Sequence, residues 1–318
     1  MTQWRWGLIG TGSICDQFAR DLRFVEGAEL AAVASREPAK AAAFAATHAI
    51  PRSLGDFAAM LADPGIDIVY IGSPHSEHLD HAASALRAGK HVLCEKPLTM
   101  SRSQADQLAA TWRTSGRYLM EAMWTWFLPA IRQVQLWIAE GRIGALKHIK
   151  ADFGYPQRYD PAGRMYNPAL GGGALLDMGV YPIALAWLLH RQMPRSIEVC
   201  SKAAANGVID DLTMMFDYGE HVATLGTSFR CKLQNWAYVI GRDGYIAIPD
   251  FWRAREAMLY RLDTCVEHYR DDRLHQGFAY EAAAVQADIG AGRIQSGVVS
   301  IADSLAIQTL MDQVRARC

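Results

Sequence analysis

The sequence predicts an α/β protein in which an N-terminal Rossmann domain, a doubly wound parallel sheet, precedes an α/β domain with a large, mainly antiparallel open sheet. Two observations predict the first domain. Short apolar strands alternate with helical segments from residue 6 to residue 122, and Gly10-Thr11-Gly12 follows the first strand directly. A third observation predicts the second domain: from residue 146 onward, strand-like runs follow one another across short glycine-containing turns. We therefore expect one domain over residues 1–122 and another over residues 123–318.

Composition sets limits on the class of protein. The 318 residues are enough for two hydrophobic cores, and the net charge of -1, without a run of basic residues, gives no reason to expect binding to nucleic acid. The six cysteines are scattered and form no Cys-x-x-Cys pair, which favours reduced thiols. The first strand begins too early for us to expect a signal peptide, and we expect no stretch that reaches the length of a membrane span. These observations predict a cytoplasmic protein without a membrane partner.

The first glycine-rich loop predicts a dinucleotide site. The apolar strand 6–9 leads into Gly10-Thr11-Gly12-Ser13-Ile14, and a helix is expected over residues 14–24. Gly10 permits a tight turn, Gly12 allows the backbone to approach a pyrophosphate, and the helix N-terminus offers unpaired N–H groups. Cys15 stands where the third glycine of this motif is usual. The alternative interpretation is an ordinary strand-to-helix turn.

The end of the second strand, residues 29–34, predicts which nicotinamide cofactor is bound. An NAD site places an acidic residue here for the ribose 2′-hydroxyl, whereas this chain has Ser35 and Arg36. A hydroxyl and a guanidinium suit a 2′-phosphate, so we predict NADP, with NAD less suited. Glu37 comes one residue too late for the acidic position. Alternatively, Arg36 is only a solvated loop residue.

The next two strands bring further polar residues to the same sheet edge. Strand 66–71 is followed by Ser73, Pro74 and His75, and the helix after it carries His78, so we expect these four residues beside the nicotinamide ribose. A metal site at these histidines is rejected, because no cysteine or carboxylate set completes a tetrahedron. Strand 91–94 ends in Glu95-Lys96-Pro97, and we expect Glu95 and Lys96 to contact the cofactor as well. A lysine at this edge is well placed to hold or move a proton beside a nicotinamide.

The second half of the chain has a different order of expected strands and helices. The expected strands and helices are separated by glycines at 219, 241 and 244. Strands are expected over residues 146–153, 196–202, 211–217, 221–229 and 236–241, and helices over residues 129–140, 173–189, 278–291 and 299–317. Three glycines, 171–173, precede a helix that carries Asp177 and Tyr181 four residues apart, hence on one face. The alternative for Tyr181 is a buried core tyrosine with a satisfied hydroxyl.

Together, Gly10-Thr11-Gly12, Glu95-Lys96-Pro97 and the glycine-rich approach to Asp177 resemble the glucose–fructose oxidoreductase/inositol dehydrogenase/rhizopine-catabolism family over nearly the whole chain. Tyr181, where many members have histidine, resembles the branch of the dimeric dihydrodiol dehydrogenases and NADP-dependent D-xylose dehydrogenases, as do residues 121–129. The resemblance implies that Lys96 and Tyr181 are the catalytic pair, that Asp177 lines the site, and that the C-terminal sheet forms a homodimer interface.

The expected reaction is reversible hydride transfer between a secondary alcohol and the nicotinamide. A free tyrosine has a pKa of about 10, and an adjacent ammonium favours the phenolate, so either lysine or tyrosine is able to move the proton. Aromatic residues are expected to form one wall of a pocket for a sugar or a trans-dihydrodiol, although each is equally compatible with a place in the core. They are Trp124, Trp126, Phe127, Phe153 and Tyr155. Two other classes stay open: an NADP-sensing regulator without catalysis, and a sugar oxidoreductase that retains its cofactor.

Overall fold

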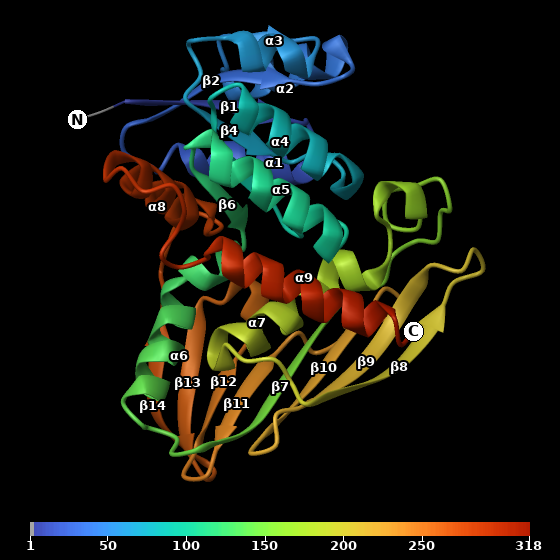
Figure 1. Cartoon of the computed structure of the whole chain (residues 1–318). Helices are drawn as coiled ribbons and strands as arrows, with labels where there is room; N and C mark the ends of the chain where they lie inside the picture. Colours follow the sequence, from blue (N-terminus) through green and yellow to red (C-terminus); the bar gives the residue numbers. More distant parts are fainter. Residues whose placement is uncertain (1–2) are drawn as a thin grey trace. The chain divides into compact units, whose positions relative to one another are not determined.

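The computed structural model describes residues 3–318 and divides into two compact units (Figure 1). Unit 1 comprises the described part of Met1–Trp124 together with Leu274–Leu305, and unit 2 comprises Thr125–Arg273 and Ala306–Cys318. The sequence-based boundary after residue 122 stays a prediction about domains.

Unit 1 contains a six-stranded parallel sheet in the order β3-β2-β1-β4-β5-β6. The strands are β1 (Trp4–Ile9), β2 (Ala28–Ala34), β3 (Ser53–Leu54), β4 (Ile68–Ile71), β5 (His91–Glu95) and β6 (Leu119–Ala122). The helices are α1 (Ser13–Leu22), α2 (Pro38–His48), α3 (Phe57–Ala62), α4 (His78–Arg87), α5 (Arg102–Ser115) and α8 (Phe278–Gly290). The alternation of strand and helix confirms the predicted doubly wound sheet. α9 (Ile301–Arg315) begins in unit 1 and ends in unit 2.

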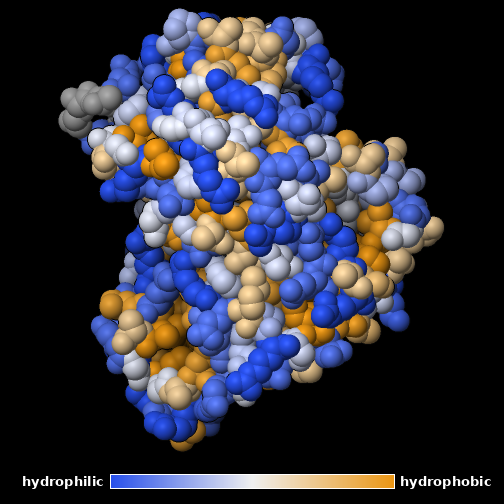
Figure 2. Space-filling model, in the orientation of Figure 1, coloured by the Kyte–Doolittle hydropathy of each residue, from blue (hydrophilic) through white to orange (hydrophobic). Residues whose placement is uncertain are grey.

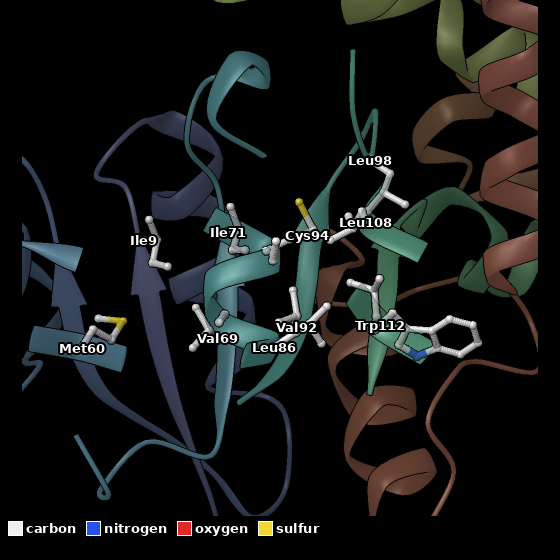
Figure 3. Packing of buried hydrophobic residues seen from close by; sticks show 14 of the residues in the cluster. Ile9, Met60, Val69, Ile71, Leu86, Val92, Cys94, Leu98, Leu108 and Trp112 are labelled. Atoms are coloured by element: carbon white, nitrogen blue, oxygen red, sulfur yellow. The ribbon is translucent and has the colours of Figure 1, made fainter. Parts of the chain in front are cut away.

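The core of unit 1 explains why its central strands are apolar on both faces. Val69 pairs with Val92 and Ile71 with Cys94 across β4 and β5, and all four are fully buried. Figure 3 shows these side chains packed with residues of the neighbouring helices, Leu86 and Leu108 among them. Helices on both faces of a parallel sheet remove both sets of side chains from water, which favours continuous apolar strands over alternating ones. Because β1, β4 and β5 are neighbours in this parallel sheet, their carboxyl ends lie side by side.

Local signals in the sequence mark where two helices of unit 1 begin. The side chain of Asp56 accepts a hydrogen bond from the N–H of Ala59 at the start of α3. Ser101 does the same for Gln104 at the start of α5. These side-chain caps satisfy N–H groups that the helix itself leaves unpaired.

Unit 2 contains an eight-stranded sheet in the order β14-β13-β12-β11-β7-β10-β9-β8. Only the β7–β10 pair is parallel, which confirms the prediction of a mainly antiparallel sheet. The strands are β7 (Leu146–Gly154), β8 (Ser196–Ala203), β9 (Ile209–Asp217), β10 (Val222–Ser228), β11 (Ala237–Gly241), β12 (Tyr245–Ile248), β13 (Glu256–Arg261) and β14 (Thr264–Arg270). The sequence predicted five of these strands and missed β12, β13 and β14. β14 is mostly exposed and lies at the sheet edge, so it carries no buried alternating stripe to reveal it.

Two helices cover one face of this sheet (Figure 1). α6 (Pro129–Ala139) packs on β13 and β14, and α7 (Val180–His190) packs on β7 and β10. Figure 2 shows the outer surface in this view as mainly hydrophilic, with a hydrophobic group over the part that carries α6 and β14. The exposed apolar residues of these two elements are Leu136 and Val266.

The segment that ends with α7 corrects one expectation from the sequence. The segment Pro168–His190 spans 23 residues with mean hydropathy 1.5, which is enough by length and composition to cross a membrane. The expectation that no stretch reaches that length was therefore wrong. In the structure, 78% of the apolar window is buried inside the protein. A helix that is apolar all round and buried by its neighbours has the character of a core helix.

Candidate functional site

The glycine loop of unit 1 presents an uncapped helix N-terminus. Gly10 has φ +109°, and a Cβ there would lie 2.8 Å from the carbonyl oxygen of Gly72. Gly12 is the residue before α1; it offers no side-chain cap, and a Cβ on it would meet nothing within 4 Å. Because Gly12 has no side chain, none at this position covers the first N–H groups of α1, and a ligand is able to approach them. This geometry fits a pyrophosphate, with Thr11, Ser13 and Ile14 completing the loop.

Cys15 replaces the third glycine of the usual motif, and a glycine elsewhere makes room for it. Its side chain is fully buried against Gly72 at the end of β4, and a Cβ on Gly72 would collide with the Cys15 Sγ atom. Burial raises the pKa of the Cys15 thiol to about 12. Cys15 is therefore an inert packing residue, and the loop keeps the close helix–strand approach that a third glycine normally permits.

The two residues that follow β2 are Ser35 and Arg36, and neither carries a carboxylate. Ser35 Oγ accepts a hydrogen bond from the N–H of Glu37 at 3.2 Å, which fixes the turn after the strand. The carboxylate of Glu37 is bound by Lys40 Nζ at 2.6 Å. Arg36 is exposed beside them. A guanidinium without an acidic neighbour at the ribose position fits a 2′-phosphate better than a 2′-hydroxyl.

The segment after β4 is held by histidines. Ser73 Oγ lies 2.9 Å from His81 Nδ1, and the rings of His75 and His78 meet edge to face at 5.6 Å. His78 is fully buried, with Nδ1 2.9 Å from the carbonyl oxygen of Pro97 and Nε2 3.0 Å from that of Ser73. Its ring nitrogens therefore contact the protein backbone. Burial lowers the pKa of His78 to about 4, so the ring is neutral at pH 7. A neutral ring has one N–H, which donates to only one of these two carbonyl oxygens.

The end of β5 carries the residues on which the predicted chemistry depends. Lys96 is half-buried and precedes Pro97 through a cis peptide bond. Glu95 is buried, and its Oε1 accepts a hydrogen bond of 2.6 Å from the hydroxyl of the fully buried Tyr70. Because β4 and β5 are neighbours in a parallel sheet, Lys96 lies at the same sheet edge as Ser73. β1, which leads into the glycine loop, is the next strand along.

Unit 2 builds an aromatic cluster around Tyr181, which stands in the first turn of α7. Phe153 contacts Tyr181 edge to face at 5.3 Å and stacks on Trp252 at 4.8 Å. Tyr155 meets Phe153 at 5.9 Å, and Trp252 lies 6.1 Å from Tyr181. Trp252 was missed by the sequence analysis. Trp252 lies in the short turn Phe251–Arg253 between β12 and β13. Because neither strand was predicted, the sequence did not indicate where this tryptophan lies.

Asp177 lies at the start of the same helical segment, in a π-helical turn over Leu175–Gly179 that precedes α7. π-helical turns occur often at functional sites. The carboxylate of Asp177 forms an ion pair of 2.9 Å with Arg164, from the loop before the three glycines. Arg158, in the same loop, is exposed. The charge of Arg164 is thus balanced within the protein.

The aromatic residues of the segment between the units divide between them. Trp124 belongs to unit 1 and stacks on Phe278 of α8 at 4.5 Å. Phe127 and Trp126 belong to unit 2, and both are buried. Lys96 likewise belongs to unit 1 and Tyr181 to unit 2, so their predicted partnership stays a prediction.

Both halves of the chain match models of one family. Residues 4–123 match an oxidoreductase family with an NAD-binding Rossmann fold, and residues 131–247 match the GFO/IDH/MocA C-terminal domain. The trans-1,2-dihydrobenzene-1,2-diol dehydrogenase of Xenopus laevis is 33% identical over 97% of this chain and 96% of its own. The human protein of that name is 30% identical over 98% of this chain and 96% of its own.

Solved structures agree with this match. A 3-ketoreductase from Actinomadura kijaniata, in complex with NADP and TDP-benzene, superposes with a TM-score of 0.88 at 28% identity and covers 99% of this chain and 98% of its own. An aldose–aldose oxidoreductase from Caulobacter crescentus has a TM-score of 0.90 at 22% identity and covers 99% of this chain and 97% of its own, which shows the shared fold.

Proposed function

Because the chain belongs to the GFO/IDH/MocA oxidoreductase family, we propose that it is an NADP-dependent dehydrogenase acting on a secondary alcohol of a sugar or a trans-dihydrodiol. The observation that carries the proposal is the sheet edge of unit 1. There, the glycine loop after β1 and Lys96 after β5 flank the end of β4 in one parallel sheet. In open α/β sheets, ligands bind at this edge.

NADP is the proposed cofactor because of the residues after β2. Ser35 and Arg36 replace the acidic ribose ligand, and Glu37 is already bound by Lys40. The glycine loop and the N-terminus of α1 would hold the pyrophosphate. When bound, the nicotinamide supplies the site that accepts or returns a hydride. The 3-ketoreductase of similar fold was solved with NADP, which supports this choice.

Lys96 and Tyr181 are the proposed catalytic residues. The alcohol must lose a proton as its hydride leaves, and a lysine and a phenol are the groups available for holding that proton. Tyr181 is buried with its ring fixed by Phe153 and Trp252, so its hydroxyl has a defined direction. Asp177 is proposed as an acceptor for a substrate hydroxyl, with Arg164 balancing its charge.

The substrate proposal rests on the character of these side chains. The faces of Phe153, Trp252 and Tyr155 suit the C–H faces of a sugar ring or a carbocyclic diol. Because Arg164 is paired with Asp177, it offers no uncompensated charge for a phosphate or carboxylate. The names of the curated relatives, dehydrogenases of a benzene dihydrodiol, support the diol.

One experiment tests the function. The purified protein is assayed with NADP and with NAD against D-xylose, D-glucose, trans-cyclohexanediol and a trans-dihydrodiol of benzene, following the absorbance of reduced nicotinamide. We expect turnover with NADP on at least one substrate, and a loss of about a hundredfold or more in Lys96→Met and Tyr181→Phe. Activity only on a sugar phosphate, or undiminished activity in both variants, would contradict the proposal.

We also propose a cytoplasmic homodimer formed through the sheet of unit 2. β11, β12 and β13 carry a row of half-buried tyrosines on one face, with Tyr245 and Tyr260 stacked at 4.7 Å. Aromatic residues of this kind are enriched in protein interfaces. Sedimentation of the protein and of a Tyr245→Asp variant tests this: a monomer in both cases would contradict it.

A further inference from the structure

Three buried side chains hold the backbone on which Lys96 stands. The N–H of Lys96 donates to Glu95 Oε2 at 3.2 Å, and the N–H of Leu98 donates to Glu121 Oε1 at 2.8 Å. Between them, the carbonyl oxygen of Pro97 lies 2.9 Å from His78 Nδ1. With the proton of the neutral ring on Nδ1, each of the three consecutive residues thus has a backbone polar atom hydrogen-bonded to a side chain.

The three side chains come from regular elements rather than from loops. Glu95 is the last residue of β5, Glu121 lies in the neighbouring strand β6, and His78 is the first residue of α4. In the β5–β6 register, Glu121 stands opposite Cys94. Residues on strands and helices of a packed core hold their positions more tightly than loop residues do. The turn after β5 is therefore anchored from three directions.

Burying three ionisable side chains around one turn costs free energy. Glu95 is 4% exposed, Glu121 1% and His78 0%. Burial raises the pKa of both carboxyl groups, and the nearby charge of Lys96 opposes that rise in each. Tyr70 donates a further hydrogen bond to Glu95. Buried ionisable groups that surround one short turn are expected where the position of that turn matters for chemistry.

We propose that His78, Glu95 and Glu121 are positioning residues, which fix the backbone of residues 96–98 and so direct the side chain of Lys96 toward the reacting alcohol. The inference rests on the proposed catalytic role of Lys96. A catalytic group displaced by about 1 Å loses as much as a hundredfold in rate, so three anchors on adjacent residues have a direct effect on turnover. His78 acts here through the backbone, and not as a proton carrier.

Matched variants separate hydrogen bonding from packing. Glu121→Gln keeps an oxygen for the N–H of Leu98, whereas Glu121→Met has similar length and no acceptor. His78→Asn places its amide nitrogen where Nδ1 faces Pro97, and His78→Gln places it where Nε2 faces Ser73. We expect Glu121→Met and His78→Gln to lower kcat by about tenfold or more, and Glu121→Gln and His78→Asn to recover most of it.

The readouts distinguish positioning from a general loss of structure. The Kd of NADPH, measured by fluorescence titration of the full-length protein, should change by less than about threefold in all four variants. The glycine loop and Arg36 are untouched, and both ring nitrogens of His78 face backbone carbonyl oxygens. Circular dichroism confirms folding. If Glu121→Met fails to fold, the two His78 variants carry the test, since each keeps one of the two contacts.

A double-mutant cycle decides between the inference and its premise. If Glu121 acts through Lys96, Glu121→Met should cause no further loss of turnover in the Lys96→Met background. Full turnover in Glu121→Met and His78→Gln, alongside an inactive Lys96→Met, would overturn the positioning inference and leave the proposed function intact. Full turnover in Lys96→Met would instead overturn the catalytic role of Lys96, and the inference with it.

Discussion

Asp21 anchors the start of α8 from the last turn of α1, and its removal should destabilise unit 1 strongly. Its carboxylate accepts three backbone hydrogen bonds: Gln276 N–H at 3.0 Å, Gly277 N–H at 2.8 Å and Phe278 N–H at 2.9 Å. It is 2% exposed. These N–H groups open α8 and have no partner within the helix, so the carboxylate serves as a cap supplied from another helix.

The magnitude follows from these contacts. A hydrogen bond to a charged group contributes about 1.5–3 kcal/mol, and replacing a helix cap by alanine costs about 0.5–2 kcal/mol. The three bonds share one carboxylate and are not additive, so Asp21→Ala should lower the unfolding free energy by roughly 3–5 kcal/mol. In Asp21→Asn, the amide oxygen replaces Oδ2 and keeps the bonds to Gly277 and Phe278. It loses only the bond to Gln276, at a cost of about 1–2 kcal/mol.

Urea unfolding followed by circular dichroism measures the free energies, and amide hydrogen exchange of residues 276–278 reports the cap directly. Exchange there should quicken in Asp21→Ala before the rest of α8 is affected. Asp106→Ala is the control, because its ion pair with Arg102 is exposed on α5 and contributes about 0.5 kcal/mol or less. If Asp21→Ala cost no more than this control, the carboxylate would not be capping α8.

Three further predictions concern single side chains. Arg36→Ala should weaken NADP binding by roughly 1.5–3 kcal/mol and leave NAD binding nearly unchanged; isothermal titration measures both, and equal losses would contradict the 2′-phosphate role. Burial lowers the pKa of His91 to about 4, so the unfolded state binds more protons below pH 6.5, and stability is lost as the pH falls from 6.5 toward 4. His91→Asn keeps an acceptor for the N–H of Tyr118 and should flatten that loss by up to about 1.4 kcal/mol per pH unit, measured by urea unfolding at pH 7 and pH 5; an unchanged slope would contradict it. Arg164→Met should cost about 1 kcal/mol of stability in the same assay, because the Arg164 guanidinium is half exposed, and a much larger loss would show a structural role.

The fold class could be predicted because its signals are local. The strands of unit 1 are short apolar runs between capped helices, and side chains such as Asp56 and Ser101 mark where helices begin. The edge strand β14 could not be predicted in this way. An exposed strand buries no face, so its sequence carries no alternation, and only its pairing with β13 defines it.

The sequence predicted which residue types of the candidate site stand at strand ends. It did not predict which atoms these residues contact. Gly10 and Lys96 follow strands directly, Arg36 comes two residues after β2, and their chemistry is readable from the sequence. The role of His78 was not readable, because both of its partners are backbone carbonyls, and any residue has a carbonyl. The sequence predicted His78 beside the nicotinamide ribose, which stays a prediction; the contacts of its ring nitrogens with backbone carbonyl oxygens were found only in the structure.

Asp21 shows the same limit over a longer distance. In the sequence it is one polar residue of an amphipathic helix, and its hydrogen-bond partners lie about 255 residues further along the chain. α1 begins at the glycine loop, and α8 begins at Phe278, whose ring stacks on Trp124. One carboxylate therefore ties the proposed cofactor helix to the aromatic pair at the end of unit 1. The link between them runs through the backbone N–H groups of residues 276–278.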